Sequence, residues 1–217
     1  MLSSRPDISF AVNFLSRFQS GATDTHRTHL KCVLRYLQGT KDYSLVYRRS
    51  SNAEHLVGYA DADWGSDIYD RKSTSGSVFQ VFGNSIMWTT RKQLIVSLSS
   101  TEAEYVSLSQ AACDVIWLRN LLEDLRIDCC TPTTLYEDNQ SCIHIANEPR
   151  DQKRLKHLDI RYHFIRECIQ NGQIKVEYIQ TQRQVADLFT KSLPGVSFKE
   201  HRFTLGLRGG VVNQTEA

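Results

Sequence analysis

Four acidic residues stand where apolar stretches begin or end, and their side chains could hold divalent metal ions. Asp61 ends a short apolar run within the stretch VGYADADWG. Glu104, Asp138 and Asp187 repeat this placement further along the chain. Magnesium prefers carboxylate and water oxygens, and two such ions about 4 Å apart can activate a water and stabilise a leaving oxygen in phosphodiester hydrolysis. Together, the four acids point to a nucleic-acid backbone as the reacting group.

Each of these acids also has a purely structural interpretation. Asp61 fits a turn or a helix cap, and Asp138 fits the cap of a following helix, although Asn139 and Ser141 would cap that helix equally well. Asp187 lies in the first turn of a predicted helix, where acidic residues are common. The prediction of a metal site therefore rests on the four acids taken together.

Strands and helices alternate around the four acids. Apolar periodicities predict a three-stranded meander, a long helix, a strand, two helices, a further strand and a last helix. This order of elements predicts an α/β fold with a mixed sheet covered on both faces. The expected strands are 56–60, 76–82, 85–90, 133–137 and 174–179, and the expected helices are 100–123, 140–146, 159–171 and 184–191.

The long helix offers two acids near its start, and helical geometry separates them. Ser99, followed three residues later by Glu102, fits a capping box, which gives Glu102 a structural task. Glu104 instead heads an apolar stripe that continues to Leu122. A carboxylate on the helix face that packs against a sheet is unfavourable unless it is paired or bound to metal. We therefore assign the metal-binding role to Glu104.

The composition indicates a globular protein with a nearly balanced charge. The 217 residues are 41% hydrophobic and include 26 basic and 24 acidic side chains, so no global basic field indicates a nucleic-acid partner. No apolar run reaches the roughly 18 residues of a membrane span, and we expect an intracellular protein with no membrane partner. The six cysteines contain no Cys-x-x-Cys pair, which disfavours a zinc site and favours reduced, mostly buried thiols.

The two ends of the chain lie outside this alternating pattern. Apolar positions at helical spacing predict a helical hairpin over 7–18 and 25–37, with a short strand or linker at 43–48. Because the hairpin is too short to be a domain, we interpret it as the end of a larger upstream domain. The last predicted helix stops before Pro194, and a C-terminal tail is expected to follow. The predicted segments are therefore 1–48, 49–194 and 195–217.

Six sequence blocks follow one another between residues 56 and 194. They are YADADW (59–64), RKSTSG (71–76), SSTEAEY (99–105), YEDNQS (136–141), KHLDIRYHF (156–164) and ADLFTK (186–191). In this order they resemble the ribonuclease H domain of Pol polyproteins from copia-type long-terminal-repeat retrotransposons. Upstream, RPDI (5–8) and LRYLQGT (34–40) resemble the C-terminal tail of the reverse transcriptase domain. Since the polymerase palm and its catalytic aspartates are absent, no polymerase activity is expected.

The resemblance implies a fold and a metal site. The fold would be ribonuclease H-like, with a five-stranded mixed sheet of order 3-2-1-4-5 in which the fourth and fifth strands run parallel to the first. The metal-binding and catalytic tetrad would be Asp61, Glu104, Asp138 and Asp187, the acids that the sequence pattern itself favours. The cofactor would be two Mg²⁺ ions, for which Mn²⁺ can substitute. The location would be cytoplasmic, in virus-like particles, and nuclear.

Two polar segments, the loop predicted over 61–75 and the segment 150–156, are expected to contact nucleic acid through its phosphates or its 2′-hydroxyls. For the second segment, 150–156, a solvated charged surface is an equally good interpretation. The candidate residues are Arg71, Lys72, Ser73, Thr74, Lys153 and Arg154.

Two functions are compatible with these observations. The first is a metal-dependent endoribonuclease that cleaves the RNA strand of RNA/DNA hybrids during retrotransposon reverse transcription, with the upstream reverse transcriptase domain as its partner. The alternative is a non-catalytic nucleic-acid-binding or structural relic of such a polyprotein. The loop 180–184 departs from cellular ribonucleases H, because it contains no histidine to assist product release or proton transfer.

Overall fold

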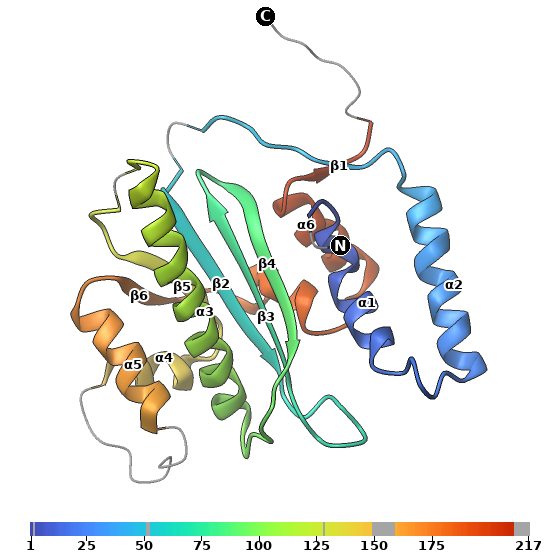
Figure 1. The fold of residues 1–217 in the computed structure, drawn as a ribbon, viewed down its shortest axis with the longest axis horizontal. Coiled ribbons are helices and arrows are strands. Elements are labelled where there is room, and N and C mark those ends of the chain that lie inside the picture. The colour runs from blue at the N-terminus through green and yellow to red at the C-terminus, as the bar shows by residue number, and fades with distance from the viewer. Residues whose placement is uncertain (2, 51–52, 128, 149–158, 211–217) are drawn as a thin grey trace, which may run out of the picture.

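A five-stranded mixed sheet forms the centre of the molecule (Figure 1). The computed structural model describes the chain except for residues 2, 51–52, 128, 149–158 and 211–217. The sheet order is β4-β3-β2-β5-β6, in which β2, β3 and β4 are antiparallel neighbours while β5 and β6 run parallel to β2. This order confirms the predicted ribonuclease H-like fold. The strands are β2 (Leu56–Asp63), β3 (Thr74–Val81), β4 (Asn84–Lys92), β5 (Thr133–Glu137) and β6 (Ile174–Tyr178).

Three helices cover one face of the sheet: α3 (Ser100–Asp124), α4 (Gln140–Asn147) and α5 (Asp159–Gln170). Figure 1 shows them together on one side, with α1 (Ser9–Ser16) and α6 (Gly195–Thr204) on the other. The stripe predicted for the long helix is buried, since Leu108, Val115 and Leu118 are at most 1% exposed. These side chains pack with residues of β2, β3 and β5 in the larger hydrophobic core. The long helix and the two helices after β5 are therefore confirmed.

The opposite face of the sheet is covered by η4 (Val185–Phe189) and α6 (Gly195–Thr204), and α1 also packs against β4. Here the prediction needs correction, because the segment expected to be a helix over 184–191 forms only the short 3-10 helix η4, which follows another short 3-10 helix, η3 (Thr181–Arg183). No element was expected after residue 194, yet α6 occupies the start of the predicted tail. Together, η4 and α6 bury a second, smaller core. Its buried members are Val78, Trp88, Val185, Leu188, Phe189 and Leu205.

The N-terminal segment forms the predicted helical hairpin. A short 3-10 turn, η1 (Pro6–Ile8), leads into α1 (Ser9–Ser16), and α2 (Asp24–Gly39) follows. Thr23 caps the start of α2, because its side chain accepts a hydrogen bond from the backbone N–H of His26. Beyond the hairpin, β1 (Ser44–Leu45) pairs antiparallel with β7 (Leu207–Arg208). The segment that follows the hairpin and the last described segment of the chain therefore form a small sheet of their own.

Polar contacts also join the N-terminal segment to α6. Arg5 donates to both carboxylate oxygens of Asp7, at 3.0 and 2.8 Å. The Tyr36 hydroxyl donates to Asp7 Oδ2 at 2.5 Å, and Arg202 of α6 donates to the Tyr36 hydroxyl at 3.0 Å. Because Asp7 is only 4% exposed, its charge depends on these donors. The network fixes α2 and α6 relative to each other.

The cysteines are less buried than expected. All six lie among the described residues and none of them forms a disulfide; Cys129, Cys142 and Cys168 are buried, while the other three are exposed. In the described part of the chain, no helix combines the length and apolar character that a membrane span requires.

A glycine lets the second core approach the sheet next to the first predicted acid. Gly76 in β3 is the cross-strand partner of Asp61 in β2. A Cβ atom at Gly76 would lie 2.7 Å from Thr190 Cγ2, 2.8 Å from Phe189 Cβ and 3.0 Å from the backbone oxygen of Ala186. Since two of these three atoms are backbone or Cβ atoms, they cannot swing aside. The absent side chain is therefore what allows η4 to rest on β3.

We predict that Gly76→Ala will lower the free energy of unfolding by about 1 to 3 kcal/mol, because overpacking forces η4 away from the sheet. Urea denaturation monitored by circular dichroism measures the change. Gly39→Ala is the matched control: no atom lies within 4 Å of a Cβ at that helical position, and alanine favours a helix more than glycine does. Equal stability of the two variants would contradict the packing argument.

Candidate metal centre

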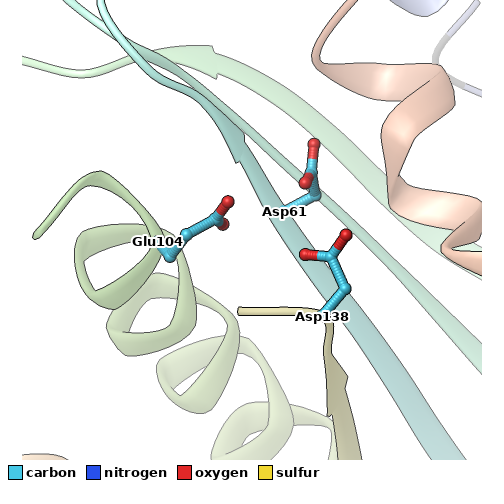
Figure 2. Close-up of side chains that lie close together, drawn as sticks. All are labelled: Asp61, Glu104 and Asp138. Atoms are coloured by element: carbon cyan, nitrogen blue, oxygen red, sulfur yellow. The ribbon is translucent and has the colours of Figure 1, made fainter. Parts of the chain in front are cut away.

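Three of the four predicted acids meet at one end of the central strands. Asp61 lies near the end of β2, Asp138 directly follows β5, and Glu104 lies near the start of α3. Each offers one carboxylate oxygen, and these three atoms lie within 4.8 Å of one another. Figure 2 shows the three side chains pointing toward one another, from the helix on one side and the strand ends on the other. The residue types and their separation are those of a site for a divalent cation.

Asp61 is fixed from both sides of the sheet. The Thr190 hydroxyl donates to its Oδ2, and Ser107 of α3 donates to its backbone oxygen at 2.7 Å. Its side chain is only 3% exposed. Burial, and next the charge of Asp187, raises the pKa of Asp61 to about 7, while Lys191 and Thr190 oppose the shift. The carboxylate is therefore held in place and lacks the solvation that would stabilise its charge.

Glu102 and Glu104 have different roles in the structure, as helical geometry predicts. Glu102 completes the cap of α3, since its Oε2 accepts the backbone N–H of Leu98 at 2.8 Å and its own N–H donates to Ser99 Oγ at 3.2 Å. Glu104 accepts the backbone N–H of Ala62. Its Oε2 is buried and has no hydrogen-bond partner among the described residues. Burial, and next the charge of Glu137, raises the pKa of Glu104 well above its usual range.

Asp138 is free of the capping role that its position suggests. Asn139 caps α4 instead, because its Oδ1 accepts the backbone N–H of Cys142 at 3.0 Å. The preceding Glu137 is fully buried, and its Oε1 accepts the backbone N–H groups of Asp138 and Asn139 at 3.1 and 3.0 Å. Burial raises the pKa of Glu137 well above its usual range, with Asp61 and Asp138 adding to the shift. Asp138 itself is half-buried and part of the three-acid cluster.

The fourth predicted acid, Asp187, lies beside the cluster but is engaged by a lysine. Its Oδ1 lies 2.7 Å from Lys191 Nζ, and the same ammonium lies 4.0 Å from Asp61 Oδ2. Asp187 is 5% exposed. Burial lowers the pKa of Lys191, but the carboxylates of Asp61 and Asp187 raise it by more, so that the net shift is upward. Asp187 thus lies near Asp61 in the structure, and the ammonium of Lys191 already compensates the negative charge of Asp187.

Four residues of this site were not predicted from the sequence: Glu137, Gln184, Thr190 and Lys191. Gln184 is fully buried, and its amide donates to the backbone oxygen of Ala60 at 2.9 Å, which ties the η4 segment to β2. The spacing of Asp187 and Lys191 is a recognisable signal, because residues four apart on a helix form ion pairs. No local pattern indicates the contacts of Gln184 and Thr190, since their partners lie 124 and 129 residues away.

A histidine does lie near Asp187, but it comes from α6 and not from the loop 180–184. His201 is 4% exposed. Burial lowers the pKa of His201, while the charge of Asp187 opposes the shift. The sequence patterns gave no reason to expect this residue, because no element was predicted after residue 194.

The predicted contacts to nucleic acid are only partly accessible. Ser73 and Thr74 are at most 1% exposed. Ser73 Oγ accepts the backbone N–H of Gly65 at 3.1 Å, and Thr74 Oγ1 accepts from Arg17 at 3.2 Å. These two hydroxyls serve the protein interior, so their expected role as donors to a substrate is corrected. The expectation failed because the segment 61–75 was interpreted as one polar loop, whereas β2 continues to residue 63 and β3 begins at residue 74.

The charged residues that were expected to contact nucleic acid differ from these two hydroxyls in their accessibility. Arg71 is exposed, and its role stays a prediction. Lys72 Nζ lies 3.8 Å from Asp70 Oδ2, so its charge is partly compensated by a neighbour. Lys153 and Arg154 lie outside the described residues.

The donor set fits a hard divalent cation. Carboxylate oxygens are the ligands that magnesium prefers. Here three of them are gathered in a largely buried cluster, in which the charges of neighbouring acids raise the pKa values of Asp61 and Glu104. The partnerless Oε2 of Glu104 is a buried acceptor that a cation would satisfy. Asp61, Glu104 and Asp138 are therefore the residues able to hold such an ion, with Asp187 adjacent.

The sheet order and the acids at the ends of β2 and β5 define the class of this protein as ribonuclease H-like. No family model matches the chain. However, the chain is 38% identical over 203 residues to the retrovirus-related Pol polyprotein from transposon RE2 of Arabidopsis thaliana, in an alignment that covers 94% of this chain and 14% of that polyprotein. The chain belongs to the family of copia-type retrotransposon Pol polyproteins. It spans about one seventh of the length of the polyproteins that it matches.

Two further comparisons describe a shorter relative and a solved structure. The chain is 48% identical over 118 residues to the secreted RxLR effector protein 161 of Plasmopara viticola, which covers 54% of this chain and 82% of that protein. The two proteins therefore share a family. The chain also superposes on a ribonuclease H1, LC11, isolated from compost, with a TM-score of 0.48 and 16% identity, over 62% of this chain and 91% of that one.

We predict that the metal-free protein loses stability as the pH rises from about 4 to about 7. The folded state keeps a proton on Asp61 up to a pH of about 7, whereas the unfolded chain releases it near its ordinary value of 3.8, so folding is favoured at the lower pH. Asp61→Asn removes the contribution of Asp61 to this dependence, while those of Glu104 and Glu137, whose pKa values are also raised, remain. At pH 8 in a chelator, the variant should exceed the parent in free energy of unfolding by up to about 4 kcal/mol.

Thermal unfolding between pH 4 and pH 8 measures this effect. The difference between Asp61→Asn and the parent should vanish toward pH 4, where both forms are uncharged at this position. Asp24→Asn is the control, because the Asp24 side chain is 96% exposed and its removal should leave the pH profile unchanged. A parent protein that is equally stable at pH 5 and pH 8 would contradict the argument.

Proposed function

We propose that this chain is a metal-dependent endoribonuclease that cleaves the RNA strand of RNA/DNA hybrids during retrotransposon reverse transcription. The observation that carries the proposal is the convergence of Asp61, Glu104 and Asp138 in one cluster, in which Asp61 and Glu104 are buried and Asp138 is half-buried. Membership of the Pol polyprotein family supports the same conclusion. A buried group of like charges is unfavourable for folding, so its presence is best explained by a cationic ligand.

The proposed cofactor is a pair of Mg²⁺ ions, with Mn²⁺ as a substitute. When bound, the pair supplies an activated water and stabilises the leaving oxygen of a phosphodiester. Asp61 and Asp138 would hold both ions, with Glu104 on one and Asp187 on the other. The expected products carry a 3′-hydroxyl and a 5′-phosphate.

The protein positions these ligands before the substrate arrives. Thr190 holds one carboxylate oxygen of Asp61 by a hydrogen bond, and the cap formed by Ser99 and Glu102 fixes the first turn of α3 that carries Glu104. Burial of the cluster excludes bulk water, which strengthens every electrostatic interaction inside it. These residues thus hold the acidic side chains in fixed positions, ready to stabilise the charge that develops during cleavage.

The proposed partners are the hybrid substrate and the upstream reverse transcriptase domain of a parent polyprotein. Arg71 is the accessible candidate for a phosphate contact. The N-terminal hairpin of α1 and α2 corresponds in this proposal to the end of the reverse transcriptase region. Polymerase activity is not expected from the chain itself.

Asp138→Asn should lower the rate of hybrid cleavage by at least about a hundredfold, since even residues that only support metal ligands contribute about 10- to 100-fold. Cleavage of a labelled RNA/DNA hybrid in Mg²⁺, resolved on a denaturing gel, measures the rate. Asp63→Asn is the matched control, because Asp63 ends the same strand as Asp61 but is not part of the cluster. Its cleavage rate should stay within about threefold of the parent.

Parental cleavage by a folded Asp138→Asn protein would refute the site assignment. A parent that binds the hybrid, with an affinity that falls as salt is raised, but leaves it intact in Mg²⁺ and Mn²⁺ would instead be the non-catalytic binding module. A parent with no salt-dependent affinity would be a structural relic.

A further inference from the structure

The Lys191 ammonium lies between two of the proposed metal ligands. Its Nζ is 2.7 Å from Asp187 Oδ1 and 4.0 Å from Asp61 Oδ2. The described ion pairs join no cation to Glu104 or Asp138 within 4.0 Å. On the side of Glu104 and Asp138, the negative charge of the cluster therefore has no protein cation beside it among the described ion pairs. On the side of Asp61 and Asp187, the ammonium of Lys191 already compensates the charge.

The backbone around Lys191 is fixed, while its side chain has room to move. The backbone N–H groups of Thr190 and Lys191 both donate to the carbonyl of Asp187 at 3.2 Å, and η4 rests on the sheet at Gly76. The Lys191 side chain is 35% exposed, whereas that of Asp187 is 7% exposed. Lysine carries its charge on a flexible four-carbon stem. The ammonium can therefore withdraw toward solvent without any change in the fold.

A divalent ion and the ammonium cannot share the same oxygen in this arrangement. A magnesium ion lies about 2.1 Å from its ligand oxygens, so an ion on Asp187 Oδ1 would meet a positive charge that is itself 2.7 Å from that atom. In a site with low exposure, the repulsion between these cations is weakly screened. One of the two must leave.

Building on the proposed function, we infer that Lys191 occupies the place of the second divalent ion and must withdraw before that ion binds. The first ion then binds at Asp61, Glu104 and Asp138, where no ammonium competes. The second ion binds at Asp61, Asp138 and Asp187 only by displacing Lys191. In the absence of metal, the ammonium offsets the repulsion between Asp61 and Asp187, so the same residue stabilises the empty site and weakens the second binding step.

Titration of the purified chain with Mn²⁺ tests this inference without substrate or turnover. The free ion is counted by its electron paramagnetic resonance signal, which gives the number of bound ions and the affinity of each step. The parent should bind a first ion tightly and a second one weakly. In Lys191→Met, the second step should gain at least about tenfold more affinity than the first, which corresponds to about 1.4 kcal/mol.

Two variants control this experiment. Lys175→Met removes a lysine that also lies 2.7 Å from a carboxylate, that of Glu177, but at an exposed position of β6, and both of its binding steps should match the parent. Lys191→Arg keeps the charge and should keep the second step weak. Circular dichroism in saturating Mn²⁺ confirms that each variant is folded.

The outcomes separate the two proposals. Failure of the parent and of all variants to bind Mn²⁺ would refute the proposed metal-dependent function. Two binding steps with the same affinities in the parent and in Lys191→Met would leave that function intact and overturn the role of Lys191. Equal gains in both steps would also overturn it, because they would indicate a general loss of positive charge instead of competition at one position. A parent that binds one ion supports the inference only if Lys191→Met binds a second.

Discussion

The rest of this structure must offset the repulsion between carboxylates that lie close together in a largely buried site. Asp61, Glu104 and Asp138 come from three different elements and have their ligand oxygens within 4.8 Å of one another. Without offsetting contacts, such a group would open or take up protons. Contacts reach Asp61 from both faces of the sheet: Ser107 of α3 holds its backbone oxygen on one side, and Thr190 and Lys191 after η4 offset the charge of its carboxylate on the other. Both layers of the fold are therefore needed to keep the cluster together.

Periodicity and capping predicted the parts of the site that depend on local structure. The choice of Glu104 over Glu102 needed only the 100° rotation per residue and the Ser99 cap, and both are present in α3. The strands were found to within a few residues for the same reason, since their apolar runs are short and bounded by turn residues. The sheet order, by contrast, came from the resemblance to a known family, because no local pattern encodes which strands pair.

The errors arose where distant segments determine the structure. A 3-10 helix such as η4 resembles one turn of α-helix in sequence, and its contact with the sheet depends on Gly76, more than a hundred residues earlier in the chain. The helix α6 has no side-chain cap at Pro194 and only one buried residue, so its sequence gives a weak signal. Ser73 and Thr74 look like loop residues, yet partners in other segments bury them. In each case the determining contact is tertiary.

The docking of η4 on β3 has a consequence for the order of folding. The β2–β3–β4 meander closes short loops, whereas η4 meets this meander only after β5, α4, α5 and β6 have been traversed. Contacts between segments so distant in sequence form late, because closing a long loop loses more chain entropy. We therefore expect the three-acid cluster to form before Thr190 and Lys191 reach it, so that a nascent chain passes through a stage in which its acids are gathered without their counter-charge. Divalent ions present during synthesis would stabilise that stage.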